Sequence, residues 1–312
     1  MRAHFSILWV MICFVGPSFA DHQDTRPLRV SQADEPWIIS ESGTHKLTRN
    51  ITLENPASPA IMIKADNVVL DLRGFTVAHV SPMALATIKI EHGLSNVTIK
   101  NGTIQTAIST EGAYSFAILS MPSPDFSVKT GSIVLTSLSI EGMGGIRINQ
   151  ASYVQVENCR QINVENVGIE ISNTYLAILK FNEIKYRSGT GIRVRGGQKH
   201  QISFNDILRN MKEPLYPPYS NNIGIYLDAK NSKIIANRIW DSSVAGIFLG
   251  RNENSTNFIQ YNRIMHSSFL PGQETKSGYG IVNRDLTNKI EDNGFEWNDN
   301  FDIRFIGEDE TL

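Results

Sequence analysis

The sequence predicts an all-β fold, a parallel β-helix, in which three short strands form each coil and stack on the strands of the next coil. Three observations predict it: a repeated phrase, an alternation of residue types within that phrase, and a column of asparagines. The phrase opens with Gly-Ile and returns about every 22 to 34 residues, a period typical of solenoids. Its copies begin at Gly145, Gly168, Gly191, Gly224, Gly246 and Gly280.

Alternation within each copy indicates strands with one buried face. In the copy at Gly224, Ile225 and Leu227 are expected to face a core, while Tyr226 and Asp228 face outward. No copy contains an amphipathic helical pattern. With looser copies upstream and one more near the C-terminus, the chain is expected to form about ten coils. One buried column is predicted to contain Ile169, Ile192, Ile225, Ile247 and Ile281.

A column of asparagines supports the same coils, each residue lying between two strands. Asparagine tolerates a left-handed backbone, and its amide can bond to the copies above and below, so we expect a structural ladder. A row of ligand-binding amides is the alternative interpretation. The members are Asn158, Asn182, Asn205, Asn237, Asn262 and Asn293.

The stretches ADNVVLDLRGFTV (residues 65–77) and LSNVTIKNGTI (residues 94–104), together with the Gly-Ile coils, resemble right-handed parallel β-helix proteins of the pectin-lyase-like superfamily. The resemblance covers about Thr44 to Phe305. It implies a single-stranded, right-handed parallel β-helix. It leaves the chemistry open, because that superfamily includes polysaccharide lyases, glycoside hydrolases, uronate epimerases, phage tailspikes and NosD-like periplasmic proteins.

The chain is expected to begin with a cleaved signal peptide. Arg2 precedes a short apolar run, Phe5 to Val15, and small residues before Ala20 suit cleavage there. The mature protein, starting at Asp21, would be secreted or periplasmic, and no later stretch reaches the length of a membrane span. The predicted divisions are a signal peptide over 1–20, an N-terminal cap over 21–43, the β-helix over 44–306 and a tail over 307–312.

The composition of the chain limits the kinds of partner and cofactor that it is expected to bind. The net charge of −2 at pH 7 provides no basic field for nucleic acid. Cys159 is the single cysteine outside the signal peptide, which excludes an intramolecular disulfide and a cysteine-based zinc site in the mature chain. We expect no cofactor and a monomer. Ca²⁺ at Asp228 has little support, because calcium sites draw several oxygens.

The candidate site lies on the outward side of the first strands of the coils that begin at Gly191 to Gly280. Two insertions, residues 208–222 and 265–278, are expected to overhang this face and wall a groove. Because arginine matches carboxylates in two-bond geometry, the ligand is expected to be an acidic polysaccharide or glycan. The predicted substrate-binding residues are Arg193, Phe248, Arg251, Arg284, Tyr216 and Tyr219.

Chemistry on a uronate needs one group that neutralises the carboxylate and another that removes the α-proton. Arg193, Arg195 or a bound cation suits the first role, and Asp228 could hold Ca²⁺ or orient Arg195. Tyr226, Lys230 or His200 suits the second role, although His200 is expected to be exposed and idle. The predicted catalytic residues are Arg195, Tyr226, Asp228 and Lys230. The expected function is therefore β-elimination or C5-epimerisation by an exported carbohydrate-active protein.

Other interpretations stay open. Inverting hydrolysis needs two carboxylates about 6.5–9.5 Å apart, and Asp228 and Asp285 would barely meet this. A non-catalytic module could bind glycan or support an envelope assembly, as NosD-like proteins do, or serve as a spacer. The arginines could instead pair with Glu170, Asp228 and Asp285 as a solvated ladder. The two insertions could merely cover exposed aromatic rings.

Overall fold

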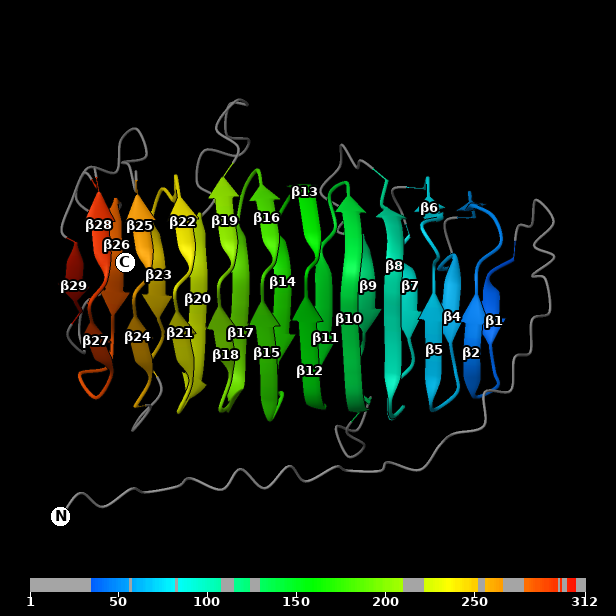
Figure 1. Ribbon diagram of the computed structural model, residues 1–312, viewed down its shortest axis with the longest axis horizontal. Coiled ribbons are helices and arrows are strands. Elements are labelled where there is room, and N and C mark those ends of the chain that lie inside the picture. Colours follow the sequence, from blue (N-terminus) through cyan, green and yellow to red (C-terminus); the bar gives the residue numbers. More distant parts are fainter. Residues whose placement is uncertain are drawn as a thin grey trace, which may run out of the picture.

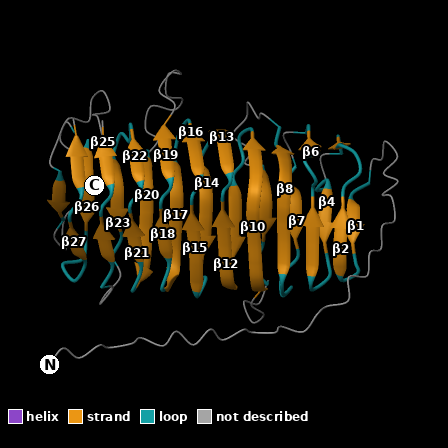
Figure 2. Ribbon diagram, in the orientation of Figure 1, coloured by secondary structure: helices purple, strands orange, loops and turns teal. Residues whose placement is uncertain are grey.

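The computed structural model describes residues 35–55, 58–81, 84–107, 115–123, 130–209, 222–251, 256–265, 278–296, 298 and 302–306. Within these ranges every regular element is a β-strand, as Figure 2 shows. Equivalent strands of successive coils lie side by side, in chain order along the long axis (Figure 1). The predicted all-β solenoid is confirmed.

The first strands of the coils form one parallel sheet of eleven strands, in agreement with the prediction of about ten coils. Its strands are β1 (Trp37–Ile39), β4 (Ile61–Ile63), β7 (Ala86–Ile90), β9 (Phe116–Ser120), β11 (Ile146–Asn149), β14 (Val167–Ser172), β17 (Thr190–Gln198), β20 (Ile223–Lys230), β23 (Ala245–Leu249), β26 (Tyr279–Asn283) and β29 (Ile303–Phe305). Strand β1 pairs with β4, so the first coil begins inside the segment predicted to be a cap.

The second and third strands of each coil complete the solenoid, and they also pair in parallel with the coils before and after. The second strands are β2 (Gly43–Lys46), β5 (Val68–Asp71), β12 (Ala151–Glu157), β15 (Leu176–Lys180), β18 (Gln201–Ser203), β21 (Lys233–Ile235), β24 (Phe258–Gln260) and β27 (Lys289–Glu291). The third strands are β3 (Ile51–Leu53), β6 (Thr76–His79), β13 (Arg160–Val164), β16 (Glu183–Tyr186), β19 (Asp206–Arg209), β22 (Arg238–Trp240), β25 (Arg263–Met265) and β28 (Gly294–Glu296). Strands β8 (Val97–Gln105) and β10 (Thr130–Glu141) run through both positions.

The core runs down the axis of the solenoid and is built from stacked aliphatic side chains. The predicted column of Ile169, Ile192, Ile225, Ile247 and Ile281 is confirmed, because these residues pair in register and all are fully buried. Burial of such columns is the main favourable term for a fold that makes few local contacts.

The repeated glycine is required by space where each first strand begins. A Cβ on Gly224 would lie 2.4 Å from Ile239 Cγ2 and 2.5 Å from the carbonyl oxygen of Gly246. Gly191 and Gly246 meet the same two obstacles in their own coils. The Gly-Ile phrase therefore marks the point where the first strand crosses closest to the third strand of its coil.

The asparagine ladder is confirmed over five coils. Asn182, Asn205, Asn237 and Asn262 are buried, and each accepts a hydrogen bond on Oδ1 from the backbone N–H of the residue one coil earlier. Asn293 continues the ladder with a bond of 3.0 Å from Asn262 N.

The prediction was wrong by one residue for Asn158. Cys159 takes the ladder position there, and its N–H donates to Asn182 Oδ1 at 3.0 Å. The left-handed residue is the one before each ladder position, as at Asn158 (φ 53°) and Phe181 (φ 56°). The asparagines therefore serve the ladder with their amides, and a neighbour makes the turn.

A second ladder explains His200, which the sequence analysis expected to be exposed. His200 is 1% exposed; its Nδ1 accepts from Ala177 N and its Nε2 donates to Gly196 O. The ladder continues through Ser232 and Asn257, which accept from the backbone N–H one coil earlier. Burial lowers the pKa of His200, and its ring is not available to act on a ligand.

Gln161 is a misfit in the core and gives a first prediction. It is fully buried on β13, neither side-chain polar atom has a hydrogen-bond partner, and the residues in register on either side are Ile140 and Ile184. An unsatisfied buried amide costs about 1–3 kcal/mol. We expect Gln161→Ile to raise the free energy of unfolding by about that amount in thermal or denaturant unfolding. An unchanged or lowered free energy of unfolding would contradict the conclusion that the buried Gln161 amide destabilises the core.

Candidate functional site

The outward side of the first-strand sheet carries the predicted site residues in two adjacent columns. In the first column, Glu170 pairs in register with Arg193, Arg193 with Tyr226, and Tyr226 with Phe248. In the second, Arg195 pairs in register with Asp228. The register therefore brings Arg193, Arg195, Tyr226 and Asp228 together on β17 and β20.

The first column begins with a buried carboxylate between two arginines. Glu170 is 3% exposed; its Oε2 is 3.0 Å from Arg147 Nε, and its Oε1 is 3.9 Å from Arg193 Nη1. Arg193 also donates to Thr190 Oγ1 at 3.2 Å. Burial lowers the pKa of Arg193, and Glu170 opposes that shift. Arg147 and Arg193 thus pair with Glu170 across coils, as the ladder alternative predicts, but the shared carboxylate is buried and not solvated.

Tyr226 and Phe248 stack on neighbouring strands, with ring centroids 5.4 Å apart and planes 10° apart. Phe248 is 7% exposed and belongs to a second apolar cluster, outside the core, that also contains Tyr279 and Val282. Tyr226 is half-buried against this cluster. Phe248 therefore supports the Tyr226 ring and presents little surface of its own.

Arg195 and Asp228 form the polar part of the site. Arg195 is exposed, and its guanidinium carbon lies 5.6 Å from the centroid of the Tyr226 ring. Asp228 Oδ1 is buried without a hydrogen-bond partner. Gly250, on the next coil, leaves room for this carboxylate, because a Cβ there would lie 2.8–3.0 Å from the Asp228 side chain.

The two titratable groups have raised pKa values. Burial raises the pKa of the Asp228 carboxyl, and the positive charge of Arg195 offsets part of the effect. Burial, and then the charge of Asp228, raise the pKa of the Tyr226 hydroxyl. Tyr226 is therefore poorly suited to the base role, since it holds its proton more tightly than an ordinary tyrosine.

The remaining predicted residues are more peripheral. Lys230 lies at the end of β20 and is half-exposed, while Arg251 is exposed just after β23. Arg284 lies 6.0 Å from the Phe248 ring centroid. Tyr216 and Tyr219, like most of both insertions, lie outside the described residues.

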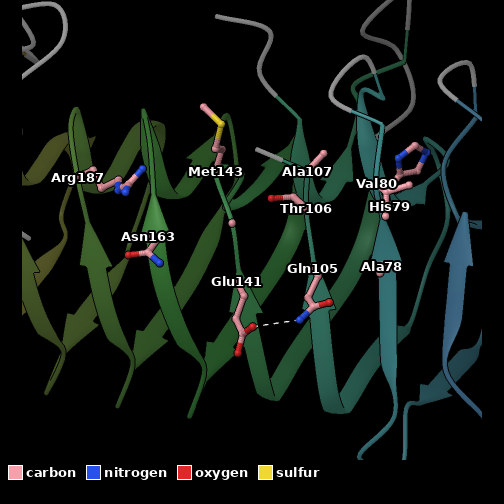
Figure 3. A pocket seen from close by; sticks show the side chains of 11 residues that line it. Ala78, His79, Val80, Gln105, Thr106, Ala107, Glu141, Met143, Asn163 and Arg187 are labelled. Atoms are coloured by element: carbon pink, nitrogen blue, oxygen red, sulfur yellow. Dashed lines mark hydrogen bonds between the residues drawn. The ribbon is translucent and has the colours of Figure 1, made fainter. Parts of the chain in front are cut away.

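The structure also contains a groove that the sequence analysis did not foresee. A cavity of about 500 Å³ crosses the carboxyl ends of the third strands, from His79 at one end to Arg187 at the other (Figure 3). Gln105 and Glu141, from neighbouring coils, meet in it through a hydrogen bond of 3.1 Å. Its residues come from five coils and share no motif, so only a coil-by-coil alignment of strand ends could have found it.

Two further observations concern the ranges that the structure describes. There, His, Cys, Asp and Glu side chains do not gather in threes as metal ligands would. In the same ranges, no helix has the length and apolar character needed to cross a membrane.

Comparison with known proteins identifies the architecture. The family described as the right handed beta helix region matches residues 144–309, more than half of the chain. No curated protein matches.

Solved structures with a similar arrangement are distant. The Dettilon tailspike protein (gp208) is 11% identical with a TM-score of 0.46, over 84% of this chain and 60% of the tailspike's length. The A-module of mannuronan C-5 epimerase AlgE6 from Azotobacter vinelandii is 13% identical with a TM-score of 0.37, over 86% of this chain and 90% of the module. The AlgE4 A-module is 12% identical with a TM-score of 0.32, over 87% and 89%. These likenesses say nothing about the chemistry of this chain.

Proposed function

Because this chain belongs to the right-handed β-helix family, whose coils present long rows of side chains, we propose that it is an exported protein acting on an acidic, uronate-containing polysaccharide. The site is the outer face of β17 and β20, at Arg193, Arg195, Tyr226 and Asp228. The reaction is removal of the proton at C5 of a uronate, leading to β-elimination or C5-epimerisation.

The observation that carries the proposal is the state of Asp228. Its Oδ1 is buried without a partner, its pKa is raised, and it lies in register with an exposed arginine. A desolvated carboxylate held without a full set of hydrogen bonds is unfavourable for stability and suits a group that exchanges protons. In a purely structural role, Asp228 would be expected to pair closely with Arg195.

In the proposed mechanism, Arg195 binds the uronate carboxylate and withdraws charge from it, which acidifies the proton on C5. Asp228 accepts that proton. In elimination, the electrons of the C5–H bond form the C4–C5 double bond, and the oxygen on C4 leaves with a proton from the Tyr226 hydroxyl. In epimerisation, Tyr226 returns a proton to C5 from the opposite face, and solvent restores both groups.

The test offers pectin, alginate and glycosaminoglycans, with absorbance near 232 nm reporting elimination and affinity electrophoresis reporting binding. We expect Asp228→Asn to lower turnover by about 100-fold or more while binding persists, since general-base removal typically costs this much. Arg195→Gln is expected to lower both turnover and binding affinity. The matched controls are Asp206→Asn and Arg160→Gln, which lie on third strands away from this face.

The pH dependence of turnover gives a further prediction. Asp228 must be deprotonated to act as the base, so the rate is expected to rise with pH through an apparent pKa above the 3.8 of an ordinary aspartate. At alkaline pH the rate is expected to fall as Tyr226 loses its proton. A rate that is flat from pH 4 to pH 7 would contradict the role of Asp228.

A non-catalytic glycan-binding module is the second candidate. The pairing of Arg147 and Arg193 with Glu170 favours it, because these two cations are already neutralised and only one arginine of β17 and β20, Arg195, is left to bind a uronate carboxylate. It predicts binding that Arg195→Gln weakens and Asp228→Asn leaves intact, with no turnover of any polymer by the wild type.

A further inference from the structure

The groove across the third strands is separate from the proposed site and has its own chemistry. It extends over the ends of β6, β8, β10, β13 and β16, whereas the proposed site lies on β17 and β20. Five coils spaced by about 4.8 Å span on the order of 19 Å. A cavity of this size and length suits an extended ligand rather than a compact one.

The floor of the groove is held by hydrogen bonds between coils. Thr106 N donates to Glu141 O at 2.9 Å, Glu165 N to Met143 O at 2.9 Å, and Arg187 N to Val164 O at 2.8 Å. Thr106 Oγ1 accepts from Gly144 N at 3.1 Å. The backbone groups that would pair with an added peptide strand are therefore already used, which disfavours an extended peptide as the ligand.

Besides His79, Thr106 and Arg187, the polar groups that line the groove are the amides of Gln105 and Asn163 and the carboxylate of Glu141. Gln105 Nε2 donates to Glu141 Oε2. This bond leaves the amide oxygen of Gln105 and the second carboxylate oxygen of Glu141, both on exposed side chains, as acceptors for hydroxyl groups. Figure 3 shows this pair at the middle of the groove, with Asn163 between it and Arg187.

Asn163 is held in a special backbone conformation. It is the extra residue of a β-bulge between Ile162 and Val164, with φ 62°, and its side chain is exposed. Bulges and left-handed residues of this kind re-aim a side chain, and they recur at functional sites. Here the bulge presents the amide of Asn163 at the groove.

The charges of the groove do not favour a polyanion. Arg187 is paired with Glu165 at 3.3 Å, and Glu141 adds an exposed negative charge. Ala78, Val80 and Ala107 supply apolar surface beside the polar groups. Apolar wall together with amide and carboxylate groups matches a sugar chain that has hydroxyl groups and no charge.

We propose that this groove binds a neutral glycan chain, as a second carbohydrate site distinct from the face proposed for the acidic polymer. Gln105 and Glu141 accept from sugar hydroxyls, and Asn163 contributes both a donor and an acceptor.

Isothermal titration calorimetry with cellohexaose, mannohexaose and N-acetylchitohexaose tests the proposal, with hexagalacturonate as the acidic comparator. At least one neutral hexasaccharide is expected to bind the full chain. Asn163→Gly is expected to weaken it about 3- to 10-fold, the effect of losing one or two hydrogen bonds. Glycine accepts φ 62° without strain, so this variant keeps the bulge.

Asn158→Gly is the matched control, because Asn158 is also exposed and left-handed but lies between β12 and β13, outside the residues that line the groove. It is expected to leave the affinity unchanged. Ala107→Trp, which fills the groove, is expected to abolish binding while circular dichroism stays unchanged.

To show that the two sites are independent, the variant of each site is tested for binding of the other site's ligand. Arg195→Gln is expected to leave neutral-glycan binding intact, and Asn163→Gly is expected to leave binding of the acidic polymer intact. The proposal is overturned if no neutral hexasaccharide binds, if binding is unaffected by both Asn163→Gly and Ala107→Trp, or if an extended Ser/Thr-rich decapeptide binds the groove instead.

Discussion

Replacing Gly224 with alanine is expected to lower the free energy of unfolding by about 3 kcal/mol, the upper part of the usual range for an overpacked core. The new methyl group would lie 2.4 Å from Ile239 Cγ2 and 2.5 Å from Gly246 O. Neither neighbour can move easily, because Ile239 is fully buried and Gly246 belongs to the sheet. Denaturant unfolding followed by circular dichroism measures the loss.

Gly294→Ala is the matched control, since Gly294 also lies in a strand and has nothing within 4 Å of the position of an added Cβ. This substitution is expected to leave the free energy of unfolding unchanged or to raise it by a few tenths of a kcal/mol, because alanine reduces the conformational entropy of the unfolded chain. Gly→Ala substitutions at unstrained positions typically raise it by roughly 0.4–1 kcal/mol. Equal losses in the two variants would mean that the close approach of the coils is not what selects glycine at Gly224.

Replacing Asn205 with alanine is expected to cost a similar amount, about 3 kcal/mol. The change removes the oxygen that accepts from both Asn182 N and Asn182 Nδ2, and the amide that donates to Leu179 O and Asn237 Oδ1. These partners are buried and have no water to replace the lost bonds, so each contributes a desolvation penalty. Thermal unfolding of the purified variant measures the effect.

The end of the ladder provides the comparison. Asn293 also accepts from Asn262 and donates to Ile259 O, but it is only half-buried. Water can replace part of its bonding, so Asn293→Ala is expected to cost about 1 kcal/mol. If Asn293→Ala were as costly as Asn205→Ala, burial would not be the reason that the ladder is stabilising.

The fold could be predicted from sequence because a solenoid repeats its physical constraints in every coil. The glycine, the buried isoleucines and the asparagine each have the same structural role at the same position of successive coils. Each coil therefore provides independent evidence for the same pattern. Single departures were harder to predict. Cys159 occupies a position that asparagine fills in the later coils of the first ladder. His200 belongs to the second ladder, whose other members are serine and asparagine, so its side chain did not reveal the pattern.

The candidate site was predictable only in part. Alternation placed Arg195, Tyr226 and Asp228 on one face, and the register confirms this arrangement. Alternation gives no information on what covers a face, so the burial of Phe248 and Val282 was not foreseen. The groove depends on a bulge at Asn163 and on strand ends in five coils. These features differ from coil to coil, so a search for a repeated pattern does not detect them.

The most direct test of the central claim, that Asp228 removes the C5 proton of a uronate, is solvent exchange at that carbon. Polygalacturonate, polymannuronate and a desulfated glycosaminoglycan would be incubated with the protein in D₂O, and the products examined by NMR. We predict loss of the C5 proton signal, through deuterium incorporation or double-bond formation, in at least one polymer with wild-type protein and Asp206→Asn, and retention of the signal with Asp228→Asn. Exchange that persists in Asp228→Asn, or no exchange by the wild type in a polymer that it binds, would contradict the claim.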